Sequence, residues 1–224
     1  MLGGQGIWDG VDVALVVGTR YLAPALSWGR ERDVRIIRVD IDAVQLQKPH
    51  PAEISILAHA RPALAALAQG LATSVRSRPS RSAQLDAVRR HIASQLAELE
   101  PQSGFSRVIR EEMPDDGIIV TDVTQMATFI QYGMPAYQPR TIITPGAQST
   151  LGYGYPTALG AKVGNPDRKV LSISGDGGFM FTVQELATAV AHKIGVVSVV
   201  FNDNAFGNVK YIQKTSYGGR HIAV

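Results

Sequence analysis

Residues 170–178 read VLSISGDGG, a short apolar run that leads into a glycine-rich turn. The run is branched and lacks charges, which is typical of a buried parallel strand. The glycines that follow permit backbone conformations and close approaches that a Cβ atom would block. The stretch therefore predicts a strand that ends in a tight polar loop carrying Asp176.

The segment after this loop predicts a helix. Thr182-Val183-Gln184-Glu185 fits the S/T-x-x-E capping box, so we expect the helix to begin at Thr182. Gly195 is placed to end it. Apolar residues at helical spacing should bury one face, and they are Leu186, Val190 and Ile194.

A second strand is predicted over residues 196–201, and it ends in Asn202-Asp203-Asn204. Two polar loops then follow two parallel strands, at the edge where open α/β sheets bind ligands. Asp176 and Asp203 are 203 − 176 = 27 residues apart, so their carboxylates can converge on one hard cation. The amides of the first loop can face an anion. Either loop alone is explained by a structural turn, but the pair favours a site for Mg²⁺ and a diphosphate.

The composition excludes several classes of protein. With 224 residues, 45% of them apolar, the chain can bury one good core or two small ones. The absence of cysteine excludes disulfides and thiolate sites. The chain has no apolar run of 18 residues and no signal peptide, so a soluble, cytoplasmic protein without a membrane partner is expected. The net charge is +3, and much of the excess lies in a basic run at residues 76–81. No aromatic residues interleave with this run, which favours a solvated linker over a nucleic-acid-binding segment.

Several segments resemble one enzyme family. Gly175-Asp176-Gly177 followed by Asn202-Asp203-Asn204 resembles the motif of thiamine diphosphate-dependent enzymes. Residues 151–158, LGYGYPTA, resemble the G-F-G-x-P-A-A segment of the acetolactate synthase and benzoylformate decarboxylase group. Residues 179–187 are also similar to that group, and residues 11–71 resemble the second half of the family's middle domain.

The resemblance implies an α/β fold with parallel sheets flanked by helices. The expected domains are a partial, Rossmann-like middle domain over residues 1–74, a linker and connecting helix over 75–102, and a C-terminally truncated cofactor domain over 103–224. Residues 1–10 predict no element. Further strands are expected at residues 13–17, 34–40, 54–57, 118–120 and 141–144, and further helices at 62–71, 84–100 and 105–113.

The resemblance also implies the chemistry. It describes a thiamine diphosphate- and Mg²⁺-dependent enzyme that decarboxylates a 2-oxo acid and then joins or releases the product. It assigns the metal to the side chains of Asp176 and Asp203 and the carbonyl of Ala205. The residues matched to cofactor contacts are Gln125, Leu151, Gly175, Gly177, Gly178 and Phe179.

Two of these matches have equally simple structural explanations. Gln125 is matched to the diphosphate contact, but it is also explained as an amide on a helix surface. Leu151 takes the position of the large apolar residue that holds the cofactor bent, yet its residue type alone indicates core packing.

No catalytic residue is assigned, because the family's activating glutamate lies in a first domain that no segment here resembles. We therefore expect a fragment that binds cofactor weakly and does not turn over by itself. A non-catalytic cofactor-fold or interaction module is the alternative. The intact parent is expected to be a homo-oligomer, a dimer or tetramer, and this chain to expose an apolar surface around Leu151, Tyr153 and Tyr155.

Two segments partly match the binding motifs of other cofactors, a nicotinamide dinucleotide and FAD. Gly152-x-Gly154 follows a strand as a nicotinamide-dinucleotide fingerprint does, but the third glycine is missing and Pro156 interrupts the turn. In acetolactate synthases the loop matched to Gly18-Thr19-Arg20 can touch FAD. Here Tyr21-Leu22-Ala23-Pro24 replaces the usual Phe-Asp-Asp-Arg, which argues against a tightly bound FAD.

Overall fold

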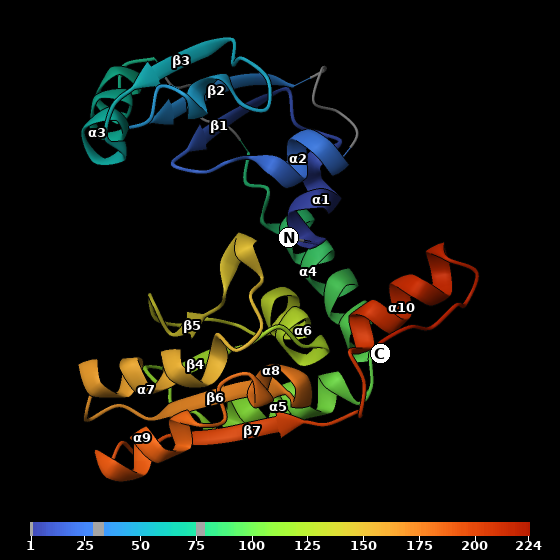
Figure 1. Cartoon of the computed structure of the whole chain (residues 1–224). Coiled ribbons are helices and arrows are strands. Elements are labelled where there is room, and N and C mark those ends of the chain that lie inside the picture. The colour runs from blue at the N-terminus through green and yellow to red at the C-terminus, as the bar shows by residue number, and fades with distance from the viewer. Residues whose placement is uncertain (1, 29–33, 75–78) are drawn as a thin grey trace. The chain divides into compact units, whose positions relative to one another are not determined.

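The computed structural model describes residues 2–28, 34–74 and 79–224 (Figure 1). The chain forms two compact units, Met1–Ile92 and Ala93–Val224. The division falls inside helix α4, Ser82–Ala97. Residues 75–78, which include much of the predicted linker and two of its arginines, lie outside the described residues.

The first unit contains a parallel sheet in the order β1-β2-β3 (Figure 1). All three strands were predicted to within one residue, and the predicted helix is confirmed as α3. Strand β1 is more exposed than expected, because Val16 is its one buried residue. The elements are β1, Val13–Val17; β2, Arg35–Asp40; η1, Gln45–Gln47; β3, Ile54–Leu57; and α3, Ala60–Leu71.

The first residues of the chain form a helix, α1, Leu2–Trp8, so the prediction of no element there is wrong. Trp8 is buried, and its ring lies 5.2 Å from that of Trp28 and 6.1 Å from that of Tyr21. This aromatic contact is a tertiary interaction that compensates for the poor helix propensity of a glycine-rich segment. A second helix that was not predicted, α2, Leu22–Ser27, follows Tyr21.

The second unit contains a parallel sheet in the order β5-β4-β6-β7 (Figure 1). The predicted parallel α/β architecture is confirmed. The strands are β4, Ile118–Thr121; β5, Ile142–Ile143; β6, Val170–Gly175; and β7, Val197–Phe201.

Helices cover both faces of this sheet. Ile119, Leu171 and Ile173 point to one face and pack against α6, Gln125–Gly133, and α5, Gln102–Glu112. Ile118 and Val120 point to the other face and pack against α7, Gly154–Gly164. Because both faces are covered, β4 and nearly all of β6 are buried, including the serines at 172 and 174.

The connection between β6 and β7 differs from the prediction in three ways. The GDGG turn is the first part of a helix, α8, Asp176–Met180. The next helix, α9, is Glu185–Ala191, so it does not begin at Thr182. The capping box does not form, because Thr182 accepts the Glu185 amide with its carbonyl, at 3.0 Å. Its hydroxyl is buried without a partner.

Two of the three residues predicted to form the buried face of this helix are exposed, while Ile194 is half-buried and lies beyond the end of the helix. Leu186 is 42% exposed and Val190 is 78% exposed. Helix α9 has two turns and packs against α7, and its Val190 side remains exposed in the described part of the chain. The remaining elements are η2, Gly146–Gln148, and α10, Gly207–Ser216. Among the described residues, none of the helices has both the length and the apolar character to cross a bilayer.

Candidate cofactor site

The loops after three strands meet at one edge of the second sheet. Gly175 is in register with Phe201, so Asp176 and Asn202 leave the sheet beside each other. Thr121, the last residue of β4, is in register with Ile173. The carboxyl ends of parallel strands are where open α/β sheets bind ligands. The structure therefore brings the two predicted loops together with the loop that leads into α6 at Gln125.

The acidic residue of the first loop begins a helix. Asp176 is the first residue of α8, where a carboxylate is favourable against the helix dipole. A Cβ atom on Gly177 would lie 2.5 Å from Cε1 of Phe206. Only glycine allows that ring to pack directly on the backbone of the motif. The first motif is thus in contact with the segment that follows the second motif.

The second loop is shaped by its own side chains. The Asn202 Oδ1 accepts the amide of Asn204 at 2.9 Å, and the Asp203 Oδ1 accepts the amide of Ala205 at 3.2 Å. Such Asx turns tolerate left-handed backbone, and Asn204 has φ 55°. Asp203 and Ala205 line a pocket, while Asn204 does not.

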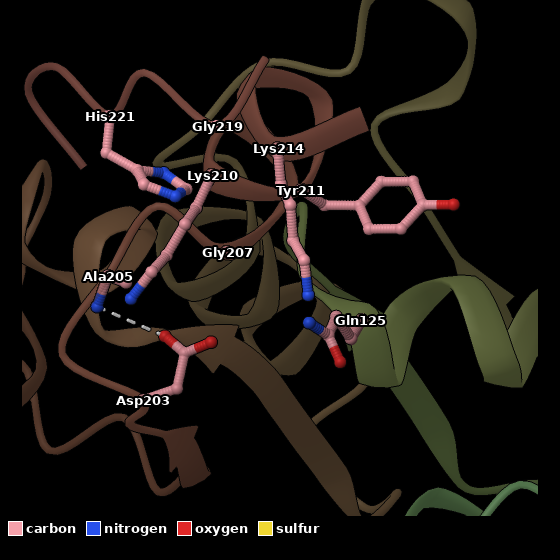
Figure 2. Close-up of a pocket in the computed structure, with 9 residues that line it drawn as sticks. All are labelled: Gln125, Asp203, Ala205, Gly207, Lys210, Tyr211, Lys214, Gly219 and His221. Carbon is pink, nitrogen blue, oxygen red and sulfur yellow. Dashed lines mark hydrogen bonds between the residues drawn. The ribbon is translucent and has the colours of Figure 1, made fainter. Parts of the chain in front are cut away.

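That pocket is open and has a volume of about 710 Å³ (Figure 2). It unites three predicted residues, Gln125, Asp203 and Ala205. A Cβ atom on Gly207 would lie 2.8 Å from the Asp203 Oδ2 and 3.3 Å from the Gln125 Nε2, so glycine leaves room for both. The full lining is Gln125, Asp203, Ala205, Gly207, Lys210, Tyr211, Lys214, Gly219 and His221.

Basic side chains that were not predicted as site residues also face this pocket. Lys210 and Lys214 lie one turn apart on α10, and Figure 2 shows them extending toward Asp203 and Gln125, respectively. His221 comes from the segment after α10. That segment is fixed by two hydrogen bonds of 2.9 Å between Gln213 and Ile222. Two lysines and one carboxylate make a pocket that attracts anions. The i, i+4 lysine spacing after the asparagine-rich loop was the available signal.

The other predicted site residues, including the predicted metal ligand Asp176 and the motif residue Gly177, do not line the pocket. Leu151 is half-buried, Gly175 ends β6, and Gly178 is buried. The Phe179 ring packs edge-on against Tyr155, with centroids 5.5 Å apart. Burial raises the pKa of the Tyr155 phenol.

The expected apolar surface around Leu151, Tyr153 and Tyr155 is wrong in part, because Tyr155 is buried. Its ring faces the interior of the unit and packs against Phe179 instead of facing solvent. The larger exposed apolar side chains of this region lie on and after α8, on α9 and on β7, and they are Met180, Phe181, Val190 and Val197.

The donor atoms suit Mg²⁺ and a diphosphate. In the described part of the chain, no three His, Asp or Glu side chains gather around one point. A cation held here would therefore need oxygens from other sources as well, such as backbone carbonyls and a bound phosphate. Carboxylate, amide and carbonyl oxygens are the ligands that Mg²⁺ prefers, and it is commonly shared with substrate phosphates. The lysines complement the remaining phosphate charge.

The structure opposes the nicotinamide alternative. The Gly154 amide, which a pyrophosphate would need at the start of α7, is donated to the Asp122 Oδ2 at 2.8 Å. Gly152 has φ 80°, and a Cβ there would lie 2.9 Å from Cβ of Phe181. At these two glycines the backbone packs closely against other segments of the chain, which leaves no room for a bound pyrophosphate. Asp122 was not singled out from the sequence.

Part of the chain matches a family of known proteins. Residues 122–224 match the family model described as thiamine pyrophosphate enzyme, C-terminal TPP binding domain. Over 205 residues the chain is 35% identical to a probable 2-ketoarginine decarboxylase of Pseudomonas aeruginosa. The aligned region covers 89% of this chain and 36% of that protein. It is 32% identical to the acetolactate synthase isozyme 1 large subunit of Escherichia coli, with coverage of 92% and 37%.

A probable acetolactate synthase large subunit of Methanococcus aeolicus is 41% identical over 107 residues, which is 48% of this chain and 18% of that protein. The chain thus spans little more than a third of the length of the first two relatives.

Proposed function

Because residues 122–224 belong to the thiamine pyrophosphate enzymes as their C-terminal cofactor-binding domain, we propose that this chain holds thiamine diphosphate through Mg²⁺. We propose further that it serves a 2-oxo acid decarboxylase or carboligase resembling acetolactate synthase. The observation that supports this best is the pocket that unites Gln125, Asp203 and Ala205 with two lysines. The named relatives are a decarboxylase and synthases, which favours an enzyme over an interaction module.

Each residue has a role in this proposal. The carboxylates of Asp176 and Asp203 and the carbonyl of Ala205 would hold the metal. Gln125 would donate its amide to the diphosphate, and Leu151 would support the cofactor from its half-buried position. When bound, thiamine diphosphate supplies an electron sink for the carbanion that decarboxylation leaves.

The chain's own basic residues suit the substrate as well as the cofactor. Lys210 and Lys214 raise the local concentration of anions near the metal-binding loop. A 2-oxo acid carries a carboxylate that such cations would attract. In the complete protein we propose a homo-oligomer, since exposed apolar side chains on α9 and β7 would be covered by a partner surface.

The proposed cofactor site is tested by calorimetric titration of the purified protein with thiamine diphosphate. We expect weak binding that requires Mg²⁺ and is lost on chelation. Asp176→Ala should abolish the metal-dependent part, because it removes a carboxylate at the first turn of α8. The matched control is Asp167→Ala, which changes an exposed acid of the same unit. Binding that is indifferent to Mg²⁺ or to Asp176 would overturn the proposal.

A separate prediction concerns flavin. Arg20 is exposed, the Thr19 carbonyl accepts the Arg38 Nη2 at 2.8 Å, and the chain enters α2 at Leu22. We expect the purified protein to show no flavin absorption and to leave the fluorescence of added FAD unchanged. A stoichiometric yellow chromophore that survives gel filtration would contradict this expectation.

A further inference from the structure

Asp122, at the end of β4, is a buried carboxylate with no role in the proposal above. It is 1% exposed. Its Oδ1 accepts the amide of Val123 at 2.7 Å, and its Oδ2 accepts the amide of Gly154 at 2.8 Å. An ionised carboxylate is purely an acceptor, so both of its oxygens suit an N–H partner. Each backbone amide is thereby satisfied in a buried place.

The glycines of both sequence motifs lie against this side chain. A Cβ on Gly154 would be 2.9 Å from the Ser174 Oγ and 3.0 Å from Cβ of Asp122. A Cβ on Gly178 would be 2.7 Å from the Asp122 Oδ1. Side chains at either position would force the backbone away. Asp122 therefore provides the common contact between the G-x-G segment and the GDGG segment.

Asp122 also replaces a local cap of helix α7. The N-cap residue, Tyr153, makes no side-chain capping hydrogen bond. The first-turn amide of Gly154 is satisfied instead by Asp122, which lies 32 residues earlier. A carboxylate at a helix N-terminus is stabilising because it meets free amides and the positive end of the dipole.

We propose that Asp122 is a positioning residue that locks together three segments that contain predicted cofactor residues. These are residues 122–125, which lead to Gln125, residues 151–154, which contain Leu151, and residues 176–178 of the GDGG motif. Asp122 does not line the pocket, so in this proposal it acts through these segments. The assignment rests on the proposed function for its effect on binding, but the locking of the segments can be tested without any cofactor.

The informative substitution is Asp122→Asn, because it keeps the shape and removes one acceptor. The new side-chain NH₂ group must face either the Val123 or the Gly154 N–H. Two donors cannot hydrogen-bond to each other, so one of these backbone amides loses its acceptor. We expect thiamine diphosphate affinity in the presence of Mg²⁺ to fall roughly tenfold. The matched control, Asp115→Asn, changes an exposed acid of the same unit and should leave affinity unchanged.

Hydrogen exchange followed by mass spectrometry supplies the readout that is independent of binding. In Asp122→Asn, we expect faster exchange in peptides that cover residues 150–156 and 176–180, while peptides from α5 keep their protection. Unchanged exchange in both regions would overturn the inference, even if affinity falls. If the variant does not fold, the wild-type protein decides the question, since the Gly154 amide must then be strongly protected and rapid exchange there would refute the lock.

The outcomes separate this inference from the proposed function. If the wild type binds no thiamine diphosphate but Asp122→Asn loosens both glycine segments, the lock stands and the proposed function fails. If the wild type binds and Asp122→Asn binds equally well, the positioning role fails and the proposed function stands.

Discussion

Replacing Asp203 by alanine should weaken Mg²⁺-dependent binding of thiamine diphosphate about a hundredfold, which corresponds to about 2.8 kcal/mol. Asp203 is the carboxylate that lines the pocket beside Gln125 and Ala205. Its removal takes away a charged oxygen donor for the metal and also the acceptor that shapes the loop at the Ala205 amide. Titration calorimetry at fixed Mg²⁺ measures the change.

The control for this result is the neighbouring residue. Asn204 does not line the pocket and has φ 55°, so Asn204→Gly keeps the backbone conformation and removes the side chain. We expect binding to change less than threefold, an amount typical of a small adjustment in a loop. If Asn204→Gly weakens binding more than Asp203→Ala does, the metal assignment within this loop is wrong.

Replacing Ile173 by alanine should lower the free energy of unfolding of the second unit by about 2–5 kcal/mol. Ile173 is completely buried in the centre of β6, among Ile119, Met126 and Phe129. The substitution removes apolar contacts and leaves a cavity that a covered sheet cannot easily close. A typical domain has only about 5–15 kcal/mol of net stability, so the loss is large.

Urea unfolding monitored by circular dichroism measures this loss, and it should appear in the transition of the second unit. The matched control is Val197→Ala on the adjacent strand β7. Val197 is 65% exposed, so its truncation should cost less than about 0.5 kcal/mol. Equal costs at the two positions would show that this face of β6 is not the core.

The strands of both sheets were predictable because buried parallel strands leave a strong local pattern. Val170–Gly175 and Val197–Phe201 are short apolar runs bounded by glycine and asparagine. The errors arose where tertiary contacts override local preference. A helix forms at Leu2–Trp8 because Trp8 is buried against other rings. Thr182 does not cap α9, because its carbonyl rather than its hydroxyl accepts the Glu185 amide and Gln184 is the N-cap residue.

The candidate site was predictable to a similar extent. The spacing of Asp176 and Asp203 reflects one strand–helix–strand crossover, so both residues reach the same sheet edge. Lys210, Lys214 and His221 were missed because their approach depends on how α10 and the following segment fold back. Asp122 was missed because its bond to Gly154 joins residues far apart in the chain, which no periodicity reveals.

Among the described strands, β7 hydrogen-bonds to β6 alone and is the outermost strand of its sheet. Its other side presents a row of backbone amides and carbonyls, which can template the addition of a foreign strand. The strand sequence, VSVVF, contains no charge and no proline, so it lacks the residues that usually prevent strand addition at a sheet edge. A lysine in place of Val200, which is 37% exposed, would act as a gatekeeper, and it offers a rational way to keep this sheet from growing into cross-β assemblies during expression and storage.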